Sequence, residues 1–184
     1  PFLKDAPYMQ TMIANPNHIG CHTLGESEAA FTGTQAIERE LMDICAQQIF
    51  SAEPDTYDGY VASGGTEANI ESLWILRNYY QREHQAKLDE IAIVYSADTH
   101  YSIPKGVNLL SLRSVIVPVD DDTRQIQPEA MERAVKQAQK DGVRYFVLIM
   151  NMSTTMFGSV DDITQATAVM DGTGVEYRVH VDDV

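Results

Sequence analysis

Short apolar runs alternate with amphipathic segments along most of this chain, and that alternation limits the possible folds more than any other feature. Continuous apolar runs are typical of strands covered on both faces of a parallel sheet, whereas apolar residues spaced three and four apart are typical of helices. This order predicts an α/β fold with a mainly parallel sheet flanked by helices and right-handed crossovers. The expected strands are residues 91–95, 115–119, 145–150 and 177–181, and the expected helices are residues 34–50, 67–82, 128–141 and 161–170, with a short helix around Pro104.

A glycine-rich turn, Ser-Gly-Gly-Thr at residues 63–66, joins a short expected strand at residues 60–62 to the helix expected from Glu67. Glycines let the backbone come close to a ligand, and the free N–H groups of a helix start point toward an anion. The hydroxyl of Thr66 is a further donor. The pattern favours a phosphate site, and the structural alternative is an ordinary turn with Thr66 as the helix N-cap.

Composition narrows the class of protein. The formal net charge of −14 argues against a nucleic-acid partner, so a phosphate must be held by local N–H groups and hydroxyls. The two cysteines, Cys21 and Cys45, are too few for a disulfide framework and lack metal-ligand spacing. No apolar run approaches the roughly 18 residues of a membrane helix. We therefore expect a cytoplasmic protein without a metal, a nucleic-acid partner or a membrane segment.

Residues 1–28 contain turn-forming residues and no clear period, which predicts an extended N-terminal arm. The rest, residues 29–184, is long enough for one domain. His18, Cys21 and His22 invite a metal site or a nucleophile, but no second ligand cluster accompanies them, so polar loop residues are the favoured interpretation. Because the first residue is not methionine and the last follows a strand-like run, we expect a part of a longer protein.

Polar side chains follow several of the expected strands, at residues 63–66, at residues 98–102, at residues 153–155 and at Asp182. The carboxyl ends of parallel strands meet at one edge of a sheet, where functional groups of α/β proteins collect. Four polar clusters at strand ends therefore predict a site at that edge. Taken singly, each cluster also has a structural interpretation, such as a helix start or a strand-end cap.

Four motifs carry a specific resemblance. They are Ser-Gly-Gly-Thr-Glu-Ala-Asn at 63–69, Asp-Thr-His-Tyr-Ser-Ile-Pro-Lys at 98–105, Ser-Thr-Thr at 153–155 with Gly158 and Asp161, and His-Val-Asp at 180–182. In order and spacing the chain resembles the pyridoxal-phosphate-dependent amino-acid decarboxylases of fold type I over residues 15–183. That group includes glutamate, histidine, tyrosine and aromatic-amino-acid decarboxylases. The resemblance implies part of a large domain of the pyridoxal-phosphate transferase type, an amino-acid substrate and a homodimer.

The resemblance also implies how pyridoxal phosphate is held. Gly65 and Thr66 would hold the cofactor phosphate with Ser63 nearby, and Thr155 would sit beside the ring near its oxygen substituent. These four positions are expected to bind the cofactor together with two residues at the ring itself, His100 and Asp182.

His100 and Asp182 are the expected catalytic residues. His100 would stack on the pyridine ring, where an imidazole excludes water and can supply a proton. Asp182 would pair with the ring nitrogen and keep it protonated, which makes the ring an electron sink.

The chain departs from the family pattern in three ways. The family's Schiff-base lysine lies a few tens of residues beyond the position of Asp182, and no lysine of this chain stands there; Lys105 matches a different family lysine. Asp183 stands where the family usually has alanine. The C-terminal small domain is also missing, so the chain as given is expected to hold only part of a cofactor site.

The expected reaction is decarboxylation of an L-amino acid to an amine and carbon dioxide. Another fold type I reaction, that of a transaminase or a carbon–sulfur lyase, is the alternative within enzymes. A truncated homologue that binds pyridoxal phosphate or another phosphate compound without chemistry is the alternative outside them. A plain dinucleotide-binding domain fits less well, because the glycine-rich turn is not G-x-G-x-x-G.

Overall fold

The computed structural model describes residues 31–183, and the chain divides into two compact units, residues 1–62 and residues 63–184. The arm expected over residues 1–28, including His18, Cys21 and His22, lies outside the described residues. All six predicted site residues belong to the second unit.

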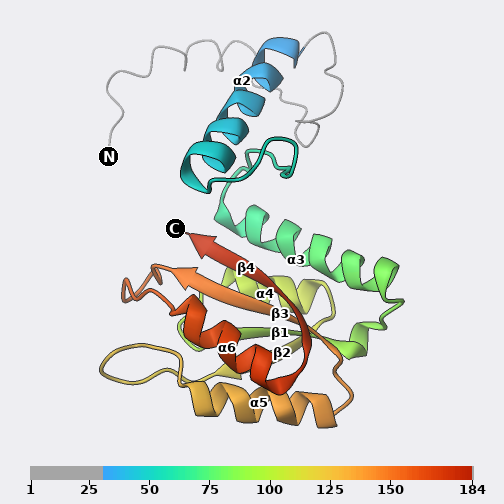
Figure 1. Cartoon of the computed structure of the whole chain (residues 1–184), viewed down its shortest axis with the longest axis vertical. Coiled ribbons are helices and arrows are strands. Elements are labelled where there is room, and N and C mark those ends of the chain that lie inside the picture. The colour runs from blue at the N-terminus through green and yellow to red at the C-terminus, as the bar shows by residue number, and fades with distance from the viewer. Residues whose placement is uncertain (1–30, 184) are drawn as a thin grey trace. The chain divides into compact units, whose positions relative to one another are not determined.

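In the first unit, the helix expected over residues 34–50 is present as α2 (Thr32–Asp43), which continues into the π-helical segment η2 (Ile44–Ile49) (Figure 1). The hydroxyl of Tyr57 donates to Asp43 at 2.6 Å and accepts from Gln47 at 2.6 Å. These two bonds tie the segment after η2 back to the helix.

The strand expected at residues 60–62 is absent, and this prediction was wrong. The backbone N–H of Val61 donates to the Glu38 carboxylate at 2.6 Å, so a side chain takes the donor that a strand ladder would use. Three apolar residues carry too little periodicity to separate a strand from a loop.

The second unit confirms the α/β prediction. Its four strands form one parallel sheet in the order β2-β1-β3-β4. The strands are β1 (Ile91–Ser96), β2 (Arg113–Val117), β3 (Tyr145–Met152) and β4 (Glu176–Asp183).

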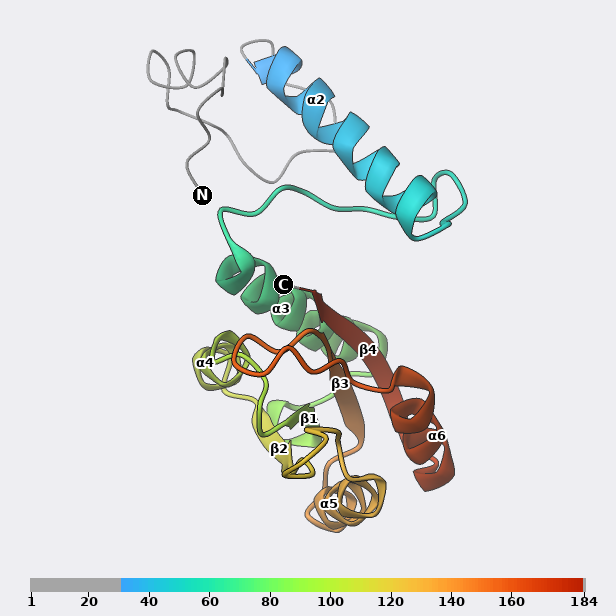
Figure 2. The same cartoon turned by 90° about the vertical axis from the view of Figure 1, so that its left-hand side faces the viewer.

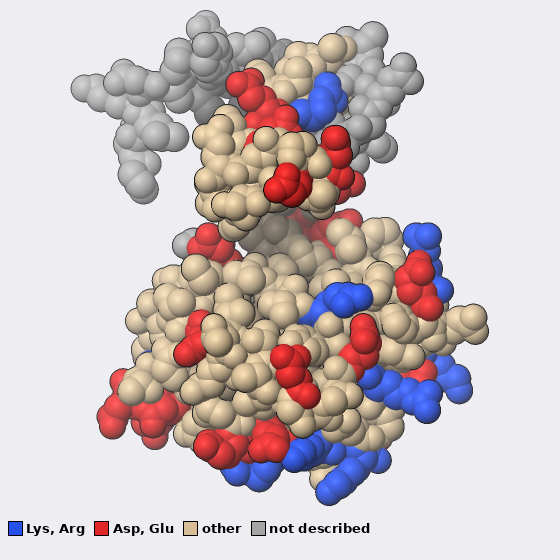
Figure 3. Space-filling view, in the orientation of Figure 1, with Lys and Arg blue, Asp and Glu red and all other residues tan. Residues whose placement is uncertain are grey.

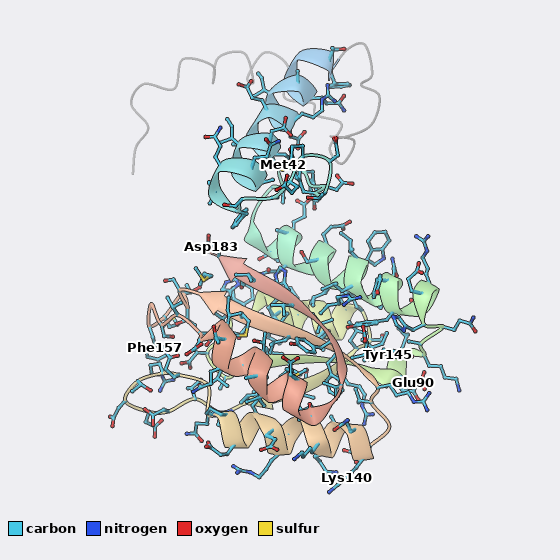
Figure 4. The ribbon with its side chains drawn as sticks, in the orientation of Figure 1. Met42, Glu90, Lys140, Tyr145, Phe157 and Asp183 are labelled. Atoms are coloured by element: carbon cyan, nitrogen blue, oxygen red, sulfur yellow. The ribbon has the colours of Figure 1, made fainter. Side chains whose placement is uncertain are left out.

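All four strands differ by one or two residues from their expected ends, and two of these differences involve Pro118 and Asp182. Pro118 falls just after β2, an outer strand of the described sheet, so its missing N–H costs no ladder bond. The last strand continues to Asp183, so Asp182 and Asp183 belong to β4 rather than following it. Figure 4 shows Asp183 at the tip of β4 and Tyr145 at the opposite end of the sheet.

Helices cover both faces of the sheet (Figures 1 and 2). The helices α3 (Gly65–Glu83) and α4 (Ser102–Leu109) lie on one face, and α5 (Pro128–Lys140) and α6 (Ile163–Thr173) lie on the other. A single turn of 3-10 helix, η3 (Leu88–Glu90), precedes β1.

Local chemistry explains where these helices begin and how closely they pack. Pro128 occupies the first turn of α5, where its missing N–H is not needed. The carboxylate of Asp162 caps α6 by accepting from the N–H of Gln165 at 2.9 Å. On α4, a Cβ atom at Gly106 would lie 2.8 Å from the Leu73 side chain, so glycine is what lets α3 and α4 approach each other.

Each face of the sheet has its own apolar cluster. The cluster under α5 and α6 contains Met131, Phe146 and Met170, all fully buried. The cluster under α3 and α4 contains Leu73, Tyr80 and many strand residues such as Ile91, Ile93, Val147 and Ile149. Packing in these two clusters holds the strands between the helices and so sets where the strand ends lie.

None of the helices in residues 31–183 is long and apolar enough to cross a membrane. On the face of the described residues drawn in Figure 3, acidic and basic side chains are interspersed.

Candidate active site

The candidate site lies where the carboxyl ends of the strands meet the start of α3. In both views of the ribbon, the end of β4 lies beside the N-terminus of α3 (Figures 1 and 2). A hydrogen bond of 2.7 Å between His180 Nε2 and Asn69 Oδ1 joins the two elements directly. Segments more than a hundred residues apart in sequence are thus brought to one edge of the sheet.

The glycine-rich turn forms the first part of this site. The helix α3 begins at Gly65 after an extended Gly64, so Thr66 lies inside the first turn and is not the N-cap. The first N–H groups of a helix have no acceptor within it, and the helix dipole adds positive character there. A Cβ atom at Gly64 or Gly65 would meet nothing within 4 Å, so the space beside the turn is open. These donors and this space suit a phosphate.

Ser63 already has a partner in this region. Its backbone N–H donates to the Glu67 carboxylate at 3.0 Å, and its hydroxyl donates to the same oxygen. The Ser63 hydroxyl has one proton to donate. A phosphate at the start of α3 would therefore have to displace the Glu67 carboxylate in order to accept that proton.

A line of four buried or half-buried polar side chains crosses the site, and we call it the Asn69 chain. His100 Nδ1 lies 2.8 Å from Ser102 Oγ, the Asn69 amide donates to Ser102 Oγ at 2.9 Å, and His180 contacts Asn69 as above. The line therefore runs from the loop after β1, through the starts of α4 and α3, to β4. It brings His100 into one connected network with the strand that carries Asp182.

Asp182 lies on the same face of the sheet as His180, because residues two apart on a strand point the same way. Asp182 is 8% exposed, and it pairs in register with Asn151 of β3. Burial lowers the pKa of His180, and the negative charge of Asp182 opposes that shift. At the end of β4 a buried acidic side chain therefore accompanies an imidazole whose charged form is disfavoured by burial.

A second polar network holds the loops after β1 and β3 together. The Asp161 carboxylate accepts from the backbone N–H of Asn151 at 2.8 Å and from its side-chain amide at 2.6 Å. The same amide contacts Thr99 Oγ1 at 3.1 Å. Burial raises the pKa of Asp161, against the effect of these two donors.

Arg124 joins three loops at this edge. Its guanidinium makes a bidentate ion pair with Asp98, at 2.9 and 2.6 Å, and lies 4.2 Å from the ring centre of Phe157. Asp98 belongs to the loop after β1, Arg124 to the loop after β2 and Phe157, labelled in Figure 4, to the loop after β3.

Thr155 stands apart from the other predicted residues. It is exposed on the loop after β3, whereas its neighbour Thr154 is buried and bonds the Ser159 hydroxyl at 2.8 Å. Within residues 31–183, no hydrogen bond joins Thr155 to His100 or Asp182.

Asn69 and Ser102 received no role from the sequence. Both lie within the quoted motifs, and both are buried, at 4% and 0% exposure. The available signal was the position of Asn69 four residues before Leu73, on the apolar stripe of its helix, where an amide needs polar partners.

Comparisons with known proteins agree with this architecture. Residues 8–183 match the family model described as the pyridoxal-dependent decarboxylase conserved domain. A tryptophan decarboxylase of Clostridium sporogenes (strain ATCC 15579) is 49% identical over 181 residues, which are 98% of this chain and 43% of the relative. A histidine decarboxylase of Mesorhizobium japonicum (strain LMG 29417 / CECT 9101 / MAFF 303099) is 29% identical over 187 residues, 99% of this chain and 46% of the relative.

Solved structures show the same fold. The glutamate decarboxylase domain of a diaminobutyrate-pyruvate transaminase and L-2,4-diaminobutyrate decarboxylase from Vibrio parahaemolyticus has a TM-score of 0.79 at 20% identity, covering 99% of this chain and 40% of that one. An L-methionine decarboxylase from Streptomyces sp.590 has a TM-score of 0.73 at 19% identity, covering 94% and 48%.

The chain therefore spans less than half of the length of the relatives it matches. The family match covers nearly all of the chain, and pyridoxal phosphate is the cofactor of that family. This chain belongs to the pyridoxal-dependent decarboxylase family.

Proposed function

We propose that the protein containing this chain removes the carboxyl group of an L-amino acid as carbon dioxide and releases the amine. The observation that carries this proposal is the Asn69 chain, because it connects His100 to the strand of Asp182 beside the open, donor-rich start of α3. A phosphate site, an imidazole and a buried carboxylate around one edge are the groups that a phosphorylated pyridine ring requires.

The residues of this chain would hold the cofactor as follows. Gly65 and Thr66 would bind its phosphate through N–H groups and the Thr66 hydroxyl, with Ser63 beside them. Asp182 would hold a proton on the ring nitrogen, and His100 would cover a ring face and exclude water. When bound, pyridoxal phosphate supplies an electron sink for the bond to the departing carboxylate. Thr155 is proposed to lie near the ring's oxygen substituent.

An aromatic L-amino acid is the substrate class that we propose first. The support is the relative named tryptophan decarboxylase, which is 49% identical over 98% of this chain. The relatives named histidine decarboxylase are less similar, at 27–29% identity.

The proposed assembly is a cytoplasmic homodimer. Apolar side chains of α2 and η2 support a dimer, since Ile37 is 69% exposed and Ile49 is 66% exposed, and such surface favours a partner. The cysteine content fits a reducing compartment, and Cys45 is a free thiol. Sedimentation of the full-length protein tests the dimer, and a monomer at micromolar concentration would contradict it.

Product analysis tests the reaction. The full-length protein with pyridoxal phosphate and L-tryptophan should release carbon dioxide and the corresponding amine in equal amounts. A keto acid without carbon dioxide would instead identify a transaminase. Asp182→Asn should abolish the reaction, because the amide cannot hold the ring nitrogen proton as a carboxylate does. Asp89→Asn, which changes an exposed aspartate at the amino end of the sheet, is the matched control and should keep full activity.

A further inference from the structure

The amide of Asn69 is buried in a place where apolar packing would be the simpler choice. It is 4% exposed and shares its helix face with the fully buried Leu73 and Tyr80. A buried amide is costly unless its donor and acceptor are both used. Here Oδ1 faces His180 at 2.7 Å and Nδ2 faces Ser102 at 2.9 Å, so both ends have partners on other elements.

The Asn69 chain has a direction. If Oδ1 accepts from a proton on His180 Nε2, then Nδ2 donates to Ser102 Oγ, and the Ser102 hydroxyl donates to His100 Nδ1. If the amide were turned over, the Ser102 hydroxyl would donate to Asn69, and His100 Nδ1 would need a proton of its own to reach Ser102.

The backbone favours the first of the two directions. The N–H of Ser102 is directed at His100 Nδ1 at 3.4 Å, and it cannot donate to a nitrogen that carries a proton. Two donors, the hydroxyl and the N–H of Ser102, therefore meet at Nδ1. With both donors at Nδ1, a single ring proton would stand on Nε2, at the edge that faces away from Ser102.

We propose that Asn69 is a positioning residue that acts through Ser102 to keep His100 in the tautomer protonated at Nε2. The inference rests on the proposed function, in which His100 covers the cofactor ring. A ring anchored at Nδ1 has one orientation, and its N–H is presented at a single edge. The neighbouring His180 is bound by the same amide, so the tautomers of His100 and His180 are set together.

Nitrogen chemical shifts of the imidazole rings test this assignment directly. The full-length protein is prepared without pyridoxal phosphate and with its histidine rings labelled with nitrogen-15. The shift of His100 Nδ1 should fall in the range of an unprotonated ring nitrogen, and that of Nε2 in the range of a protonated one. The opposite assignment in the unaltered protein would overturn the proposal at once.

Asn69→Asp is the sharpest variant, because it keeps the shape and removes the only donor of the side chain. A carboxylate accepts from both neighbours, so the Ser102 hydroxyl turns toward it, and His100 must donate to Ser102 from Nδ1. The two ring nitrogens of His100 should then exchange their chemical shifts. Asn108→Asp makes the same change at an exposed position of α4 and should leave His100 as it was.

Ser102→Ala is the second variant, and it decides the question if the aspartate variant does not fold. Removing the hydroxyl leaves only the backbone N–H of residue 102 at Nδ1, a contact of 3.4 Å that is too long to fix the tautomer alone. His100 should then become a mixture of tautomers, with both ring shifts moved toward intermediate values. Unchanged His100 shifts in either folded variant would overturn the proposal. Since these spectra need no cofactor or substrate, their outcome is independent of the product analysis that tests decarboxylation.

Discussion

The two faces of the sheet are built from the same strands and differ in what holds them. The face under α5 and α6 is closed mainly by apolar contact, with Phe146, Leu148 and Met150 fully buried, and the hydrogen bond of Tyr177 with Asp171 lies at its exposed margin. The face under α3 and α4 starts in the same way at the amino ends of the strands, but toward their carboxyl ends it carries Asn69, Ser102, His180 and Asp182.

This difference separates two tasks within one layer of strands. Apolar packing is not directional and tolerates substitutions that keep volume, whereas a buried hydrogen-bond network loses a paired donor or acceptor with every deletion. We therefore expect substitutions on the α5–α6 face to change stability, and substitutions at the carboxyl end of the α3–α4 face to change the chemistry as well.

The largest expected effect is on the α5–α6 face. Phe146→Ala should lower the free energy of unfolding by about 3–5 kcal/mol, because it leaves a cavity in a fully buried cluster. Urea unfolding measures the loss. Phe157→Ala removes an exposed ring that stacks on Arg124 and should cost only about 0.5–1 kcal/mol. Equal losses in the two variants would remove the distinction between core and loop.

At the carboxyl ends, Asp161→Ala should cost about 1–3 kcal/mol, because the backbone N–H and the side-chain amide of Asn151 lose their acceptor. Thermal unfolding measures this difference. The control is Asp122→Ala in an exposed turn, which should stay within about 0.5 kcal/mol of the original protein. An Asp161 variant as stable as the control would mean that this network adds nothing to stability.

A smaller effect is expected where α3 meets the central strand. The buried hydroxyl of Tyr80 donates to the backbone oxygen of Phe146 at 2.7 Å, and burial raises its pKa. Tyr80→Phe should lose about 0.5–1.5 kcal/mol of unfolding free energy, the net value of one hydrogen bond. Tyr101→Phe, at a ring that is 60% exposed, should change nothing measurable. A stabilised Tyr80 variant would contradict the expectation.

The smallest expected effect is the pH dependence of stability that His180 contributes. Its pKa is lowered in the folded chain by burial, with Asp182 opposing, so the unfolded chain takes up the proton first, near its ordinary value of about 6.5. The unfolding free energy should therefore fall as pH drops below that value. His180→Gln should flatten this part of the pH profile of the unfolding free energy. A steeper profile in the variant would mean that His180 changes stability with pH in the opposite direction.

Apolar periodicity was sufficient to predict the fold class and most elements. The runs at 91–95 and 145–150 are strands buried on both faces, and the helix expected over 128–141 is present with its proline in the first turn. The exception at residues 60–62 depended on the Glu38 carboxylate, a partner more than twenty residues away that no local pattern reveals.

The candidate site was less accessible to sequence reasoning than the fold. Motif order pointed to one edge of the sheet, and the structure connects His100 with the strand of Asp182 there. The connecting groups, Asn69 and Ser102, could not be predicted, because a hydrogen bond between two helix starts depends on packing distances. The roles of Ser63, Gly65, Thr66, His100, Thr155 and Asp182 toward the cofactor stay predictions.

The ion pair of Arg124 with Asp98, stacked on Phe157, has a consequence for how this family member can diversify. One guanidinium fastens three separate connections, so none of them can be lengthened or reshaped alone without releasing the other two. We expect insertions in these loops to be accepted only when the arginine keeps both of its neighbours.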